Sequence, residues 1–167
     1  MISGKASRLA LAVVLVCGLI GPAMAVGAAS VLKSRMTGAQ IANDDGGAPR
    51  GTGQAAISVN RDRGRLCFEI EYSGLGGKAT GGFLRHGGPG ELSRPAVVLF
   101  STRAASPVSG CVSNVPAKTL SAIDERPSGH YVDLTAGGYP KGAIRGQLHG
   151  SSTTDQELEG PPSGGIG

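Results

Sequence analysis

Hydrophobic and polar residues alternate along several short segments in the middle of the chain. From Gln54 to Asn60, the side chains of Ala55, Ile57 and Val59 would share one face of a strand, because successive strand residues point to opposite faces. A turn containing glycine leads to a second alternating segment over 65–73, and this arrangement is typical of a β-hairpin. Further strands are predicted over 79–86, 95–100, from 111 onward, 131–135 and 143–149.

The segment 116–126 departs from this alternation. Pro116 opens a stretch in which Leu120 and Ile123 are three residues apart, and Pro127 follows it. Because proline favours the first turn of a helix and cannot continue one, the pattern predicts a short helix near 117–126. Strands about 8–12 residues apart with turn residues between them predict an all-β fold, an antiparallel sandwich or barrel, around this helix.

The first 25 residues have the layout of a secretory signal peptide. Lys5 and Arg8 give a positive start, an apolar stretch follows over 9–20, and Ala23 and Ala25 are the small residues of a cleavage site. The apolar stretch is shorter than the roughly 20 residues that a membrane-spanning helix needs. An uncleaved N-terminal anchor is the alternative, and a second small-residue site over 27–29 leaves the cleavage position open.

The rest of the chain divides into a β-rich domain over 31–149 and a polar tail over 150–167. Ser, Thr, Gly, Pro and acidic residues dominate the tail, in which Leu158 and Ile166 are the only large apolar residues. Such a segment cannot bury enough apolar surface to offset the entropy lost on ordering, so we expect it to be disordered.

Composition and charge narrow the function. Aromatic residues make up 4% of the 167 residues and there is no Trp, so the aromatic surface on which single-stranded nucleic acid stacks is not expected. Removing Lys5 and Arg8 with the signal peptide leaves 14 basic against 12 acidic residues, a net charge of +2. A nearly neutral protein argues against electrostatic binding of nucleic acid as its main task.

Two cysteines, Cys67 and Cys111, follow the predicted signal peptide. An even pair in an exported chain is typical of one disulfide, which here would link two non-adjacent strands. The chain-entropy model gives a loop of this length a stabilisation of about 4 kcal/mol. Two free buried thiols are the alternative, and neither cysteine has further ligands at metal-binding spacing.

Three segments, supported by two others, carry a resemblance to a known family. They are Cys-Phe-Glu-Ile-Glu-Tyr-Ser-Gly-Leu over 67–75, Gly-Cys-Val over 110–112 and Gly-Ala-Ile-Arg-Gly-Gln-Leu over 142–148, with Met-Thr-Gly-Ala-Gln over 36–40 and Tyr131-Val132. In this order they resemble the chordin-type (CHRD) domain, of the small bacterial secreted type, over about 31–148. The resemblance implies an immunoglobulin-like β-barrel located outside the cytoplasm or in the cell envelope. In chordin, such domains accompany the binding of secreted growth factors.

The resemblance also implies a set of histidines that this chain lacks. Many bacterial members carry a His-x-His pair on the fourth strand and another His after the Tyr-Val pair, a trio that could hold a metal. The matching positions here are Phe83, Arg85 and Thr135. We therefore predict no metal site and no cofactor. His86, one position beyond the lost pair, is the candidate ligand of an alternative metal site, which would need a second histidine from far along the chain.

Arg61, Arg63 and Arg65 surround the predicted hairpin turn. They are candidates for contact with an anionic polymer, and a solvated turn is the alternative. Arg145 lies in the most specific of the resembling segments, where we expect a salt bridge or backbone hydrogen bonds before a binding role. No serine lies in a Gly-x-Ser-x-Gly sequence, and we predict no catalytic residues.

These observations predict an exported, non-enzymatic binding or structural module of the cell envelope or extracellular space. Its partner would be an extracellular or envelope protein or polymer and not a nucleic acid. No transmembrane segment would remain after signal cleavage. A metal-binding or redox protein with a site around His86 is the alternative function.

Overall fold

The structure is a computed structural model that describes residues 29–150. The signal peptide predicted over 1–25 and residues 151–167 of the predicted tail lie outside the described residues, whereas Gly150, the first residue of that tail, ends a strand. The strands are β1 (Ser30–Thr37), β2 (Thr52–Asn60), β3 (Arg65–Ser73), β4 (Ala79–His86), β5 (Pro95–Phe100), β6 (Val108–Val112), β7 (His130–Ala136) and β8 (Tyr139–Gly150). The helices are α1 (Ala117–Glu125) and the short 3-10 helices η1 (Gly38–Gln40) and η2 (Pro127–Gly129).

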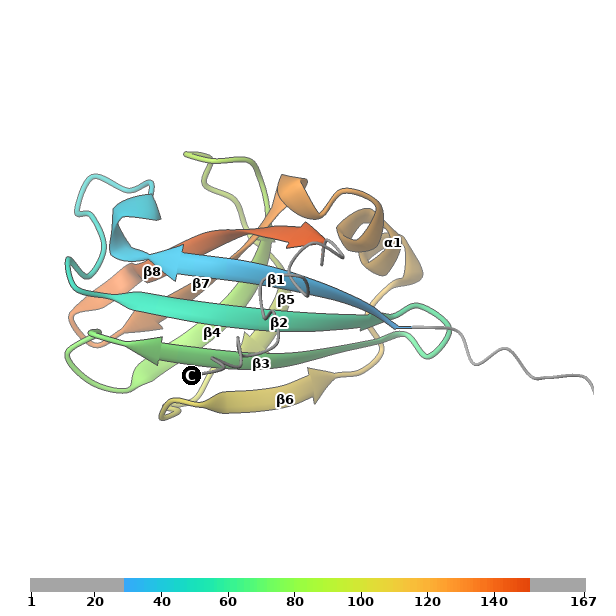
Figure 1. The fold of residues 1–167 in the computed structure, drawn as a ribbon, viewed down its shortest axis with the longest axis horizontal. Helices are drawn as coiled ribbons and strands as arrows, with labels where there is room; N and C mark the ends of the chain where they lie inside the picture. The colour runs from blue at the N-terminus through green and yellow to red at the C-terminus, as the bar shows by residue number, and fades with distance from the viewer. Residues whose placement is uncertain (1–28, 151–167) are drawn as a thin grey trace, which may run out of the picture.

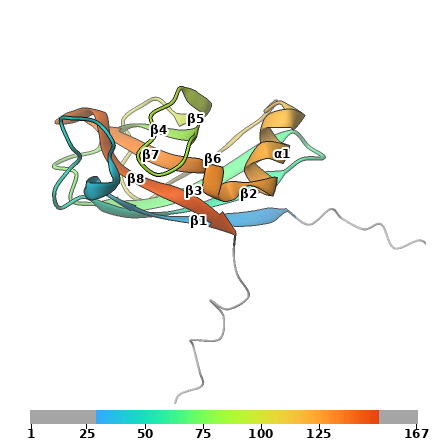
Figure 2. The same cartoon turned by 90° about the horizontal axis from the view of Figure 1, so that it is seen from above.

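All these strands form one antiparallel sheet in the order β5-β4-β7-β8-β1-β2-β3-β6. The sheet curls until its edge strands β5 and β6 approach one another, which makes a nearly closed barrel (Figure 1). Seen from above, β4, β5 and β7 lie on one side and β1, β2 and β3 on the other (Figure 2). The predicted all-β antiparallel class with one short helix is confirmed, and the barrel is the form that it takes.

The hydrophobic core lies inside the barrel, between these two sides. Ala55, Ile57 and Val59 of β2 are buried as the alternation predicts, and α1 adds Leu120 and Ile123. In the view of Figure 2, α1 lies at one end of the molecule and the segment around η1 at the other. The largest fully buried aliphatic side chains of the remaining elements are Met36, Leu66, Ile70, Leu84, Val132, Leu134, Ile144 and Leu148.

Three strands differ from the sequence prediction, and the first is β8, which begins at Tyr139 and not at the predicted Ala143. The pattern does not predict β1, because the polar Ser34 is one of its inward-facing, buried residues and interrupts the apolar alternation. The strand at Cys111 was predicted to begin there, whereas β6 begins at Val108 and ends at Val112. Gly110 weakens its apolar pattern, and the ring of Phe68 packs where a side chain would lie, 3.0 Å from an added Cβ.

Candidate functional site

Polar side chains gather on the outer face of β4, β7 and β8. In the register of these strands, Arg85 lies opposite Tyr131, Tyr131 lies opposite Gln147, and Asp133 lies opposite Arg145. They alternate with core residues, so their side chains point away from the barrel interior. Tyr131, Asp133 and Arg145 are nevertheless at most 4% exposed, so another part of the chain must cover this face.

The cover is the loop between β4 and β5, residues 87–94, which we call the strap (Figure 1). Arg145 donates from Nη1 to the carbonyl oxygen of Glu91 at 2.7 Å and from Nη2 to that of Gly88 at 2.6 Å. Gln147 Nε2 donates to the carbonyl oxygen of Gly87 at 2.9 Å. These contacts confirm the backbone hydrogen bonds expected of Arg145. Within residues 29–150, Arg145 makes no salt bridge.

The guanidinium of Arg145 is buried and lies over an aromatic ring. Its Cζ is 3.5 Å from the centroid of the Tyr131 ring, a distance at which the ring face attracts a cation. Burial lowers the pKa of Arg145, and the charges of Tyr131, Asp133 and Glu91 act in the opposite direction. An arginine stays protonated under any physiological condition, so this face holds a buried positive charge.

A second arginine pairs with the buried carboxylate of the face. Arg85 Nε donates to Asp133 Oδ1 at 2.7 Å, and Arg85 Nη1 donates to the carbonyl oxygen of Ser93 in the strap at 2.7 Å. Burial raises the pKa of Asp133, while the hydrogen bond and charge of Arg85 oppose that shift. The ion pair therefore ties β4 to β7 and also holds the strap.

A cavity of about 190 Å³ opens beside this network, between the strap and the segment that follows η1. Lys141 lies at the rim of the cavity, and its side chain is largely exposed. The Nζ of Lys141 lies 2.8 Å from Asp45 Oδ2. The lining thus contains three cationic side chains and one carboxylate. The lining residues are Ile41, Ala42, Arg85, Leu92, Ser93, Tyr131, Asp133, Lys141 and Arg145.

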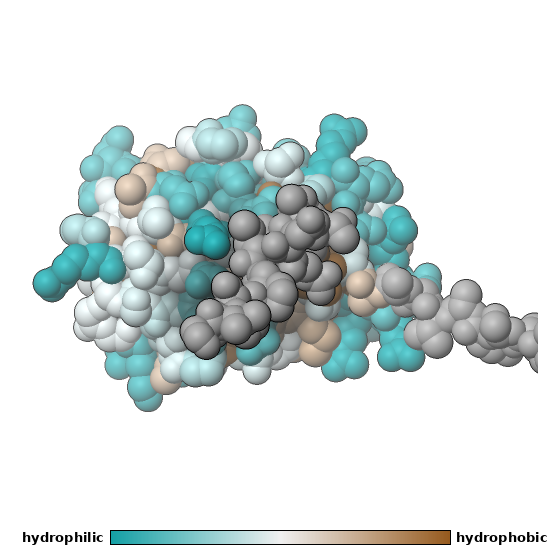
Figure 3. All heavy atoms as spheres, in the orientation of Figure 1, coloured by the Kyte–Doolittle hydropathy of each residue, from teal (hydrophilic) through white to brown (hydrophobic). Residues whose placement is uncertain are grey.

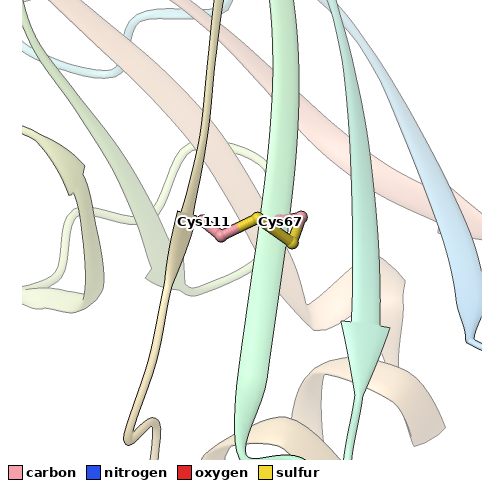
Figure 4. Close-up of a disulfide and its surroundings, with 2 residues drawn as sticks. All are labelled: Cys67 and Cys111. Carbon is pink, nitrogen blue, oxygen red and sulfur yellow. A yellow bond between two sulfur atoms is a disulfide. The ribbon is translucent and has the colours of Figure 1, made fainter.

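The disulfide lies on another part of the barrel surface, between β3 and β6. Cys67 and Cys111 are directly opposite one another, with their Cα atoms 4.0 Å apart, and are joined by a disulfide (Figure 4). The predicted bond is confirmed. The prediction that it links non-adjacent strands is wrong, because β6 pairs with β3 at the edge of the sheet.

The part of the chain that forms the barrel corresponds to a known family. Residues 32–148, from β1 to near the end of β8, match the CHRD domain. The chain belongs to the CHRD domain family. The resemblance carried by the segments around Cys67, Cys111 and Arg145 is therefore confirmed. No curated protein and no solved structure matches the chain.

Membership of the CHRD family supports, at a coarse level, a non-enzymatic binding module outside the cytoplasm. The disulfide of this CHRD domain is consistent with the same location, because such bonds persist in oxidising compartments. No helix among residues 29–150 is long and apolar enough to cross a membrane.

The positions of the lost histidine trio have other partners in this CHRD domain. Arg85 is held by Asp133, and its Cζ lies 4.9 Å from the centroid of the Phe83 ring. Thr135 Oγ1 lies 3.0 Å from Thr80 Oγ1. Within the part of the chain that the structure describes, no group of three or more His, Cys, Asp or Glu side chains could hold a metal ion.

His86 has a histidine neighbour that its position in the sequence does not reveal. His86 at the end of β4 lies opposite His130 at the start of β7, and their ring centroids are 5.2 Å apart, edge to face. His130 is buried and its Nδ1 lies 3.0 Å from the carbonyl oxygen of Arg126. His149 is exposed in the last part of β8. The fold thus brings together two of the three histidines.

The arginines of the β2–β3 turn are placed next to α1. Arg61 Nε lies 3.4 Å from Asp124 Oδ2, and Arg61 Nη1 lies 4.0 Å from Glu125 Oε1. Arg63 and Arg65 are exposed. Acidic residues of the helix therefore offset part of the positive charge of this turn. Binding of an anionic polymer there stays a prediction.

The sequence pattern does not reveal the cavity. The one usable signal for the cavity is Asp133, a charged residue that lies between the core residues Val132 and Leu134. Tyr131 and Arg145 were noted only for their place in the resembling segments. The strap has no such signal in the sequence, because its hydrogen bonds to Arg145 connect residues more than 50 positions apart.

Proposed function

We propose that this chain is an exported, non-enzymatic binding module of the cell envelope or extracellular space. Its family and its disulfide support this location at a coarse level. The observation that carries a binding role is the outer face of β4, β7 and β8, where a buried charged network borders an open cavity. Rigid, partly covered polar groups beside a cavity are typical of ligand sites.

The same groups argue against catalysis at this face. Nucleophilic catalysis needs a hydroxyl or thiol that is hydrogen-bonded to a base. The hydroxyl of Ser93 instead donates to the carbonyl oxygen of His86. The Asp133 carboxylate is instead held by Arg85 at 2.7 Å, and no hydroxyl or thiol of the described residues is hydrogen-bonded to it. These contacts support a binding role over nucleophilic catalysis for the groups that line the cavity.

The intact native mass of the protein collected from outside an expressing cell tests the proposal. We expect the mass of residues 26–167 less two protons for the disulfide, without a stoichiometric metal adduct. Protein found only inside the cell, with residues 1–25 still attached, would contradict export. A free-thiol mass from the external fraction would contradict the oxidised state on which the location is argued.

The contact between His86 and His130 favours one second candidate, a metal-binding protein. His130 Nδ1 lies 3.0 Å from a carbonyl oxygen, and if Nδ1 donates there, Nε2 is the nitrogen left to bind a metal. Under this candidate, the native mass would include one transition-metal ion. His86→Ala would remove the ion, whereas His149→Ala, an exposed histidine elsewhere, would retain it. Unchanged metal content in His86→Ala would reject this function.

A further inference from the structure

We infer that the cavity beside Arg85 and Arg145 binds a carboxylate carried on a short apolar stem. The inference rests on the proposed function, because it names the chemical group by which this binding module would hold its partner. It depends on three features of the described residues: hydrogen-bond donors without acceptors, a buried positive charge, and apolar side chains at the mouth of the cavity.

Both arginines keep N–H groups that no described residue accepts. A guanidinium has five N–H donors. Arg145 uses Nη1 for Glu91 and Nη2 for Gly88 and for Gln147 Oε1, so its Nε–H and one Nη1–H are left over. Arg85 uses only Nε and Nη1. Arg145 Nε and Arg85 Nη2 are not among the buried atoms of the described residues that lack a partner, so they remain accessible, and the oxygen atoms of an anion could accept from them.

The balance of charge favours an anion over a neutral acceptor. Arg85 and Arg145 share one buried carboxylate, Asp133, which Arg85 already binds at 2.7 Å. Two other acidic groups lie nearby, and both are exposed: Glu91, whose charge also acts on Arg145 and whose Oε2 accepts from the amide of Gly88 at 2.7 Å, and Asp45, which pairs with Lys141. A buried cation is stabilised by a paired anion, and a bound carboxylate would supply the second one.

The mouth of the cavity favours an organic anion over an inorganic one. Ile41, Ala42 and Leu92 line it, and Leu92 is 66% exposed, the highest value among the large hydrophobic residues described. A volume of about 190 Å³ equals that of roughly six waters at about 30 Å³ each. This space suits a carboxylate with a small branched hydrocarbon group, whereas sulfate or phosphate would leave the apolar side chains without contacts.

Two sources can supply such a group: a free short-chain acid, or the C-terminal carboxylate of a partner protein that ends in an aliphatic residue. The test uses the purified, oxidised chain labelled with ¹⁵N, and follows the Nε–H resonances of Arg85 and Arg145. Isobutyrate should shift both resonances saturably at millimolar concentration, and isobutyramide, its neutral counterpart of equal shape, should not. Equal shifts with both compounds, or no saturable shift, would overturn the inference.

Variants locate the site. The double variant Arg85→Gln/Asp133→Asn removes one charge of each sign and should weaken isobutyrate binding at least tenfold. Leu92→Ser, an exposed position that does not endanger folding, should weaken it about threefold. Arg61→Gln also removes one positive charge, at the β2–β3 turn away from the cavity, and should bind isobutyrate like the parent. The inference would be overturned if Arg61→Gln lost as much affinity as the double variant, or if Leu92→Ser kept the affinity of the parent.

Further arms separate the sources and the alternatives. An acetylated tripeptide with a C-terminal valine that binds tenfold more tightly than isobutyrate identifies a protein chain end, and equal affinity identifies a free acid. Sulfate that competes as well as isobutyrate would contradict the apolar stem. Because this experiment uses purified protein, its failure would leave export intact, and a failure of export would not change its result.

Discussion

Polar residues alternate with core residues both in β4, β7 and β8 and in β1, β2 and β3. The outer faces that these polar residues form differ in their exposure to water. On the first face, Tyr131, Asp133 and Arg145 are buried beneath the strap. On the second, Arg35 and Glu71 are exposed. Outside the grey atoms, hydrophilic residues and residues of intermediate hydropathy make up most of the view of this side (Figure 3).

The difference shows that polarity in a strand pattern reports which way a side chain points and not whether water reaches it. A loop that crosses an outer face turns polar residues into buried ones, and buried polar groups must then be hydrogen-bonded. On an exposed face the same residue types form hydrogen bonds with water and contribute little to stability. Substitutions on the two faces should therefore have very different costs.

Removing the guanidinium that holds the strap should have the largest effect. Arg145→Leu leaves the carbonyl oxygens of Gly88 and Glu91 and the Gln147 side chain without their donor, and should lower the free energy of unfolding by about 4 kcal/mol. Arg35→Ala on the exposed face should change it by less than about 0.5 kcal/mol. Urea unfolding of both variants checks this, and similar losses in the two would contradict the comparison.

Removing the disulfide should be the next largest effect, although the bond lies on the less covered face. Cys67→Ala/Cys111→Ala should cost about 3 kcal/mol, a little below the chain-entropy value for a separation of 44 residues, because the unfolded chain retains residual structure. Ser109→Ala on the same β6 strand serves as the control and should be nearly neutral. The Nε–H resonance of Arg145 should stay unchanged in the double variant, and its loss would show that the two faces are coupled.

The two ion pairs of the cavity region allow a buried contact to be compared with an exposed one. Arg85→Gln leaves Asp133 buried without its partner and should cost about 2 kcal/mol, much of which Asp133→Asn should restore in the double variant. The exposed pair of Lys141 and Asp45 should show no measurable coupling in the equivalent double-mutant cycle. Equal coupling energies in the two cycles would contradict the role of burial.

The smallest effect should be a dependence of stability on pH near the base of the strap. Burial lowers the pKa of His130 below its ordinary value of 6.5, and the charge of His86 adds to that shift, while a hydrogen bond with Arg126 opposes it. The unfolded chain therefore binds this proton more readily, and stability should fall as pH drops below about 6.5. Urea unfolding at about pH 5 and pH 7.5 should show the loss, and His130→Gln should reduce it. An unchanged pH dependence in that variant would assign the effect to other groups.

Much of the barrel could be predicted from local patterns. The segments 65–73, 79–86 and 95–100 coincide with β3, β4 and β5, because alternating or continuous apolar stretches between turn residues are properties of neighbouring residues. β1 escaped prediction because Ser34 faces inward. The contact between His86 and His130 could not be predicted, because it depends on the register between β4 and β7.

The amino-acid sequence by itself determined most of the strands, the faces of them that turn inward, and the pairing of Cys67 with Cys111. These are consequences of a two-residue strand period and of the two cysteines that follow the predicted signal peptide. Tertiary structure alone decided that Asp133 and Arg145 are buried and border a cavity. That outcome depends on a strap held by hydrogen bonds between residues 54 to 60 positions apart, and on the order in which the barrel places β4, β7 and β8 side by side.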